Sequence, residues 1–235
     1  MPSRIRIEIA PGDHVTALVY PAPPRKRAGI AAVLAHGAGG NQMSPFMVEF
    51  ATGLAERGVD AVTFNFVYSE QKRRLPDRND KLEVCWRAVI AAARTGTLGP
   101  EVAGGALAIG GKSMGGRIAS QVAAADAEGL AGLVLLGYPL HPPGRADQLR
   151  TRHLPAISVP MLIVQGERDA FGTPDELRPV LRRLKAKSQL YVVEGGDHSF
   201  KVPKSAGTPQ TQIHARVLGE VERWLRATAG AERSS

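Results

Sequence analysis

The chain has 235 residues, of which 43% are hydrophobic and 22% charged, a balance typical of a globular protein with a substantial core. Its 30 lysines and arginines outnumber its 22 aspartates and glutamates, and the resulting net charge of +8 permits anion binding without requiring it. The single cysteine, Cys85, excludes an internal disulfide, and no uncharged apolar run approaches the roughly 20 residues that span a bilayer.

The same features favour a cytoplasmic protein without membrane or nucleic-acid partners. The first residues, MPSRIRIE, alternate charge with isoleucine, whereas a signal peptide has a continuous apolar segment. Aromatic residues make up only 5% of the chain, and no recognition helix, zinc motif or aromatic platform accompanies the positive charge. We therefore expect a small-molecule partner. The sequence does not indicate the oligomeric state.

The chain begins with a predicted hairpin and ends with a predicted helix and tail. Residues Arg4–Ile9 and His14–Tyr20 are rich in β-formers around Pro11-Gly12-Asp13, and a proline-rich basic linker completes residues 1–28. At the other end we expect a disordered tail over residues 229–235. We interpret residues 1–235 as one domain.

Between these ends, predicted strands and helices alternate. Further strands are expected at Gly29–Ala35, Val59–Tyr68, the first half of Ala106–Gly116, Gly132–Tyr138, Met161–Gln165 and Gln189–Glu194. Helices are expected at Ser44–Arg57, Asp80–Arg94, after Ser113, at Thr173–Lys187 and at Gln210–Arg226. This alternation predicts an α/β fold with a mostly parallel, twisted sheet of about seven or eight strands and helices on both faces.

The stretch Ala106–Gly116 contains the motif G-x-S-x-G, with Ser113 between a buried strand and a helix. A serine at the apex of such a strand-turn-helix unit exposes its hydroxyl above the sheet edge. Gly111-Lys112-Ser113 also matches the end of a phosphate-binding loop. That pattern requires glycine where the chain has Ala106, and its variable positions form the predicted strand. The motif therefore favours a nucleophile over a phosphate loop.

Polar residues follow four of the predicted strands, where ligands bind in a parallel sheet. They are His36, Ser113, Asp169 and His198. A serine hydroxyl needs a base within hydrogen-bond reach and a carboxylate that orients the base. The last three residues occur in the chain order Ser, Asp, His, which is that of α/β-hydrolases.

On these motifs, residues from roughly 30 to 226 resemble the α/β-hydrolase fold in its small, lidless, dienelactone-hydrolase-like form. The resemblance implies that Ser113 is the nucleophile, His198 the general base and Asp169 its orienting acid. It also implies that the backbone amides of Met114 and Ala38 form the oxyanion hole.

The resemblance has limits that bear on the substrate. Dienelactone hydrolases carry cysteine as the nucleophile, so the serine favours ordinary ester chemistry. The chain also resembles a group that includes the testis-expressed hydrolase-like proteins and the third regulatory subunit of a histone-acetyltransferase complex, where catalysis is not the evident role.

Alternatives remain for individual residues. Asp197 lies beside His198 and is a competing acid, and Asp169 has the position of a helix cap. We expect His36 to brace the glycine turn through hydrogen bonds. The glycines after His36 do not match a dinucleotide fingerprint, because Gln42 stands where the last glycine is required. The scattered histidines form no helical metal-ligand pair, so we expect neither metal nor cofactor.

The sequence therefore predicts a serine hydrolase that cleaves a small ester through an acyl-enzyme. The alternative is a non-catalytic scaffold with the hydrolase fold that binds proteins. The short loop Pro139–Val159 leaves no room for a cap domain. Candidate pocket residues, chosen because they lie at strand ends, are His36, Gly37, Tyr68, Lys112, Tyr138, His141 and Phe171. The basic loop at residues 70–78 favours an anionic substrate, although a solvated charge run is the competing interpretation.

Overall fold

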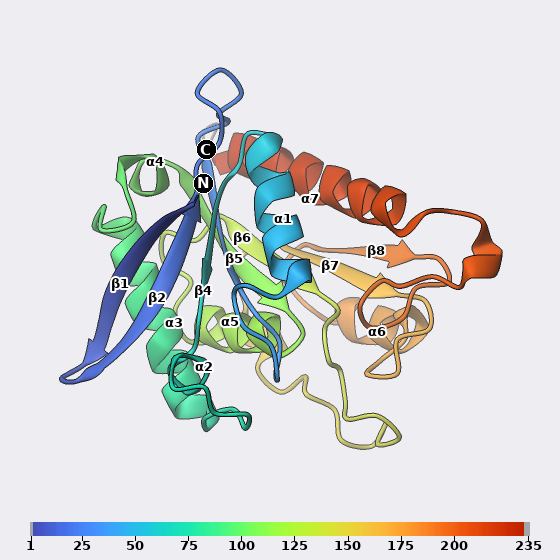
Figure 1. The fold of residues 1–235 in the computed structure, drawn as a ribbon. Helices are drawn as coiled ribbons and strands as arrows, with labels where there is room; N and C mark the ends of the chain where they lie inside the picture. The colour runs from blue at the N-terminus through green and yellow to red at the C-terminus, as the bar shows by residue number, and fades with distance from the viewer. Residues whose placement is uncertain (1, 233–235) are drawn as a thin grey trace.

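The computed structural model of the chain describes residues 2–232 (Figure 1). The strands are β1 (Ser3–Ala10), β2 (Asp13–Tyr20), β3 (Ile30–Ala35), β4 (Asp60–Phe64), β5 (Ala106–Lys112), β6 (Gly132–Leu136), β7 (Met161–Gly166) and β8 (Ser188–Val193). The α-helices are α1 (Pro45–Glu56), α2 (Val67–Glu70), α3 (Asn79–Arg94), α4 (Pro100–Ala103), α5 (Met114–Ala125), α6 (Pro174–Leu181) and α7 (Gln210–Glu232). Two short 3-10 helices, η1 (Leu154–Ala156) and η2 (Lys204–Ala206), lie in loops.

Within the described residues these strands form one eight-stranded sheet with the order β1-β2-β4-β3-β5-β6-β7-β8. The pairs β1–β2 and β2–β4 are antiparallel, and every other neighbouring pair is parallel. Parallel strands that follow one another in the chain are joined by a crossover that contains a helix or a long loop, as a parallel sheet requires. The predicted mostly parallel sheet of seven or eight strands is therefore confirmed.

Two apolar layers cover the two faces of the sheet. Side chains of α3, α5 and α6 pack in one buried cluster with β5, and side chains of α1 and α7 pack in the other (Figure 1). The central strands β3 and β6 are buried along their whole length, which explains why they are continuous apolar runs instead of alternating patterns. The covered sheet gives the strand ends a rigid base on which a site can be built.

The turn between β5 and α5 is possible only because glycines let the backbones approach closely. A Cβ on Gly111 would lie 2.1 Å from the carbonyl oxygen of Ala35 in β3, and one on Gly115 would lie 2.4 Å from the same atom. Gly111 also has φ +138°, a value that other residues rarely adopt. Ser113 itself has φ 50° and ψ −116°, so its backbone is strained. This strained turn places Ser113 at the carboxyl edge of the sheet.

Several boundaries differ from the sequence prediction. The strand expected over Val59–Tyr68 ends at Phe64, and Tyr68 lies in the one-turn helix α2. The helix expected over Thr173–Lys187 ends at Leu181, where the hydrogen bonds tighten to a three-residue spacing from Arg183 to Val180 and from Leu184 to Leu181.

At the carboxyl end, α7 continues past Arg226 to Glu232. The tail expected over residues 229–235 is therefore helical as far as residue 232. Residues 233–235 lie outside the described part.

The connection between β6 and β7 carries no cap domain. In the described structure its only helical element is η1. Within this connection the Tyr138 hydroxyl donates to the carbonyl oxygen of Arg150 at 2.6 Å. Contacts that attach the connection to the body of the fold include His153 Nε2 with Ser120 Oγ at 2.8 Å and His141 Nε2 with Glu176 Oε1 at 3.2 Å. The lidless form predicted from the sequence is confirmed. No described helix combines the length and the apolar character needed to cross a membrane.

The glycine packing yields a stability prediction. Gly111→Ala should lower the free energy of unfolding by about 2–5 kcal/mol, because it adds a clash with Ala35 to an unfavourable φ. Gly219→Ala is the matched control, since an added Cβ in α7 would meet no atom within 4 Å. It should raise stability by up to about 1 kcal/mol through helix propensity. Urea denaturation measures the free energy of unfolding of both variants. A Gly111→Ala protein as stable as the wild type would contradict the close packing of Gly111 against Ala35.

Candidate active site

Ser113 lies at the first turn of α5, where its side chain reaches the loop after β8. Its backbone amide donates to the carbonyl oxygen of Leu136 at 2.9 Å, which fixes the turn against β6. Its Oγ is 2.8 Å from Nε2 of His198. The strained backbone therefore presents the hydroxyl to an imidazole that comes from a different strand end.

The other nitrogen of His198 contacts a buried carboxylate. Nδ1 lies 2.7 Å from Oδ2 of Asp169, whose side chain is fully buried. Because a carboxylate only accepts hydrogen bonds, Nδ1 carries the proton and Nε2 is left to accept the hydroxyl proton of Ser113. This is the tautomer that a general base requires.

Asp169 is itself held by neighbouring donors. The side-chain amide of Gln165 donates to Oδ2 at 2.8 Å, and the backbone amide of Phe171 donates to Oδ1 at 2.8 Å. Gln165 also donates to the carbonyl oxygens of Tyr138 and Gly172, so it ties the acid to the ends of β6 and β7. Gln165 is not among the site residues predicted from the sequence. A buried glutamine at the end of an otherwise apolar strand was the available signal.

The competing acid Asp197 stabilises the backbone of the loop after β8 and makes no hydrogen bond to the imidazole. Its Oδ1 accepts the backbone amides of Ser199 at 2.7 Å and Lys201 at 2.9 Å, and it has no hydrogen bond to the His198 ring. These bonds close the tight turn that carries His198. The geometry thus brings Asp169, and not Asp197, to the imidazole.

The turn after β3 borders Ser113, and free backbone amides lie there and at the start of α5. An added Cβ on Gly37 would lie 3.4 Å from Cβ of Ser113, so this turn passes directly over the serine. Ala38 and Met114 line the same cavity, and neither backbone amide donates a hydrogen bond to any part of the chain between residues 2 and 232. Two unoccupied donors beside a nucleophile are the requirement for an oxyanion hole.

His36 braces this turn, as expected. It is 1% exposed, its Nδ1 is 2.8 Å from the carbonyl oxygen of Gly37, and its Nε2 accepts the amide of Phe66 at 3.4 Å. Burial lowers the pKa of His36 to about 4, so the ring is neutral at physiological pH. A neutral ring with both nitrogens occupied is suited to holding the backbone in place.

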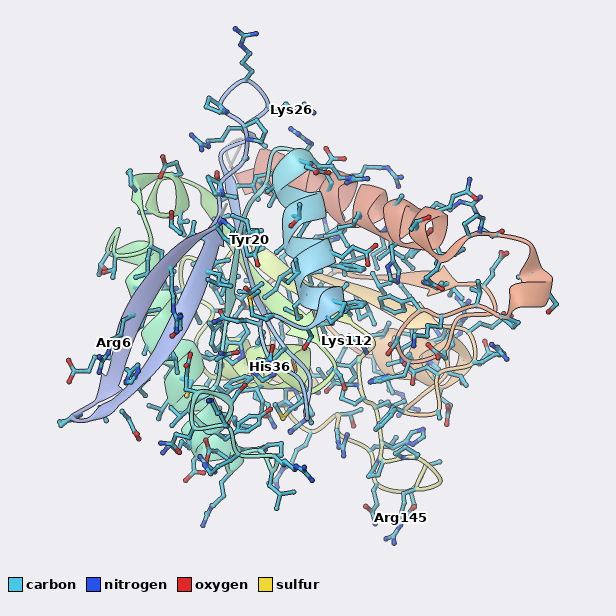
Figure 2. All side chains as sticks on the ribbon, viewed as in Figure 1. Arg6, Tyr20, Lys26, His36, Lys112 and Arg145 are labelled. Atoms are coloured by element: carbon cyan, nitrogen blue, oxygen red, sulfur yellow. The ribbon has the colours of Figure 1, made fainter. Side chains whose placement is uncertain are left out.

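Lys112 is a second buried polar group next to the serine. Its ammonium donates to the carbonyl oxygen of His198 at 2.5 Å and lies 5.8 Å from the ring centres of Phe46 and Phe200. Burial lowers the pKa of Lys112 to about 8. Figure 2 shows Lys112 and His36 in the central part of the molecule, whereas Arg145 lies at the tip of the loop between β6 and β7. Lys112 thus links the turn between β5 and α5 to the loop that carries His198.

A cavity of about 820 Å³ opens over these groups. Four of the candidate pocket residues line it: His36, Gly37, Lys112 and Phe171. The ring of Phe171 lies 4.3 Å from that of His198, measured between centroids, and covers one side of the imidazole.

The other three candidates do not line the cavity. Tyr68 is buried in α2, Tyr138 is buried and bonded to Arg150, and His141 is bonded to Pro142 and Glu176. A position at a strand end specifies the neighbourhood of a side chain, and local hydrogen bonds decide where it points.

The basic loop at residues 70–78 places an acid, not an arginine, at the cavity. Asp77 and Pro76 line the wall, and Arg73 forms an ion pair with Asp77 at 2.6 Å. Lys72, Arg74 and Arg78 are exposed and lie outside the lining. The cations that line the cavity are Lys112, Arg117, Arg150 and Lys201. In the described chain, no cluster of three or more histidine, cysteine or acidic side chains could hold a metal ion.

Comparison with known proteins gives a family match. The model of a family described as alpha/beta hydrolase domain matches residues 28–226, which is most of the chain.

Solved structures of low sequence identity share the fold. Est1E from Butyrivibrio proteoclasticus is similar with a TM-score of 0.74 at 14% identity, covering 95% of this chain and 99% of that one. A dienelactone hydrolase from Anabaena variabilis gives 0.71 at 19% identity, with 95% and 96% covered. A serine hydrolase without a lid from Xanthomonas campestris gives 0.69 at 19% identity, with 97% and 93% covered.

Proposed function

Because the chain belongs to the alpha/beta hydrolase domain family, we propose that it is a serine hydrolase that cleaves a small ester or related acyl compound through an acyl-enzyme. One observation carries the proposal: the unbroken hydrogen-bonded series from Ser113 Oγ through His198 to Asp169, with distances of 2.8 and 2.7 Å. In this series Nε2 of His198 can accept the Ser113 hydroxyl proton, because Nδ1 already donates to Asp169.

In the proposed reaction, Oγ of Ser113 attacks the acyl carbon while Nε2 of His198 takes the hydroxyl proton. The negative charge on the acyl oxygen is stabilised by the amides of Met114 and Ala38. The bond to the leaving alcohol then breaks, and His198 returns the proton to that alcohol. Water, activated by the same imidazole, releases the acid and regenerates the serine. No metal or organic cofactor takes part in this scheme.

Asp169 contributes by orientation and charge. It fixes the proton on Nδ1 and stabilises the imidazolium that forms during attack. Its bonds from Gln165 and Phe171 hold the carboxylate in place, so little reorganisation is needed during the reaction. The scaffold alternative does not account for this alignment, because protein binding does not require a strained serine with an oriented base.

The nucleophile can be tested by substitution. Ser113→Ala should lower the turnover of p-nitrophenyl acetate by several orders of magnitude without unfolding the protein, because the acyl-enzyme cannot form. Ser205→Ala is the control, since Ser205 is exposed and distant in sequence from the turn that carries Ser113. Initial rates and circular dichroism are measured on all three proteins. Unchanged turnover in folded Ser113→Ala would exclude the proposed function.

The acid is tested by a pair of matched substitutions. Asp169→Asn should reduce kcat by about 10⁴, because the amide favours the wrong tautomer of His198. Asp197→Asn should reduce it by less than about tenfold, because an asparagine oxygen can still accept the amides of Ser199 and Lys201. Steady-state kinetics on p-nitrophenyl acetate ranks the two, and the opposite order would reassign the acid.

A further inference from the structure

Two arginines from different elements line the cavity. Arg117 lies on α5, where its amide donates to the carbonyl oxygen of Ser113 at 3.0 Å, so it is one helical turn after the serine. Arg150 comes from the loop between β6 and β7. Both side chains are partly buried. Ser113 lines the same cavity, so a group bound by these arginines shares that cavity with the serine hydroxyl.

Neither guanidinium has a carboxylate partner among residues 2–232. Arg117 donates only to the side-chain oxygens of Asn79 at 3.2 Å and Gln121 at 3.4 Å. The side chain of Arg150 donates to the carbonyl oxygen of Pro139 at 3.3 Å. By contrast, the partly buried Arg27 is paired with Asp60 at 3.2 Å. These two cations therefore lack the direct ion pair that Arg27 has, although the charge of Glu83 acts on Arg117 from beyond ion-pair distance.

The two charges also act on each other. Burial and the neighbouring charge of Arg150 lower the pKa of Arg117. Holding two like charges together in a partly dry cavity is unfavourable unless an opposite charge joins them. The fold nevertheless maintains the arrangement, because the Tyr138 hydroxyl and the Leu140 carbonyl fix the backbone of Arg150 at 2.6 and 2.7 Å. The backbone of Arg150 is thus held in place beside the cavity.

We propose that Arg117 and Arg150 form an anion subsite that binds a carboxylate or phosphate on the acyl portion of the substrate. The inference rests on the proposed hydrolase function. Two guanidinium groups present planar pairs of donors, which match the oxygens of either anion. The sequence predicts an anionic substrate from the basic loop at residues 70–78, and the binding of that anion is assigned to Arg117 and Arg150 instead, because the loop places Asp77 at the cavity.

The kinetic test compares p-nitrophenyl hexanoate with the mono-p-nitrophenyl ester of adipic acid, which has the same chain length and a terminal carboxylate. The wild-type protein should have the higher kcat/KM for the acidic ester. Arg117→Gln and Arg150→Gln should each lower that value about tenfold or more, while the neutral ester changes less than about threefold. Arg150→Lys should restore part of the loss. The control, Arg74→Gln, should affect neither ester.

A binding measurement separates this inference from the proposed function and distinguishes the two anions. Adipate and inorganic phosphate are titrated calorimetrically into Ser113→Ala protein, with and without Arg150→Gln. Adipate binding that is lost with Arg150→Gln supports a carboxylate subsite, and stronger phosphate binding assigns the site to phosphate. Hydrolysis of both esters with no dependence on Arg117 or Arg150 would overturn the inference alone. Arginine-dependent binding without hydrolysis of either ester would overturn the proposed function alone.

Discussion

The site depends on the close contact between the turn that joins β5 to α5 and the neighbouring strand β3. Gly111 and Gly115 allow the chain to turn against the Ala35 carbonyl, where a Cβ would lie 2.1 or 2.4 Å from its oxygen. That contact sets the strained backbone of Ser113 and brings the turn of Gly37 and Ala38 over it. The nucleophile and both candidate oxyanion donors therefore derive their positions from one backbone contact.

The histidine and its acid reach the same point through the parallel order of the sheet. β5, β6, β7 and β8 are successive neighbours, so the loops after them open on one edge. Asp169 follows β7 and His198 follows β8, and Gln165 bonds the acid to the backbone at the end of β6. Lys112 adds a link from the elbow to the His198 carbonyl. The site is thus a product of strand order, fixed by a few buried polar contacts.

Sequence patterns predicted the regular parts of the molecule, namely the strands, the helices and the residues at the strand ends. Apolar runs and helix caps located the sheet and its covering helices, and the chain order of Ser113, Asp169 and His198 indicated which residues would meet. Patterns could not locate what depends on side-chain direction. Tyr68 follows β4 closely in sequence, yet it lies in α2 and points into the core. No sequence pattern singles out Arg117 and Arg150, and only the fold places them in one cavity, where neither forms an ion pair with a described carboxylate.

The central claim is that Ser113 is a nucleophile activated by His198. Incubation with a fluorophosphonate probe, followed by proteolysis and mass spectrometry, tests it without knowledge of the substrate. We expect one adduct, on the peptide that contains Ser113, and we expect labelling to slow strongly in His198→Ala, because the hydroxyl then lacks its base. Absence of an adduct on Ser113, or labelling at an equal rate in His198→Ala, would contradict the account.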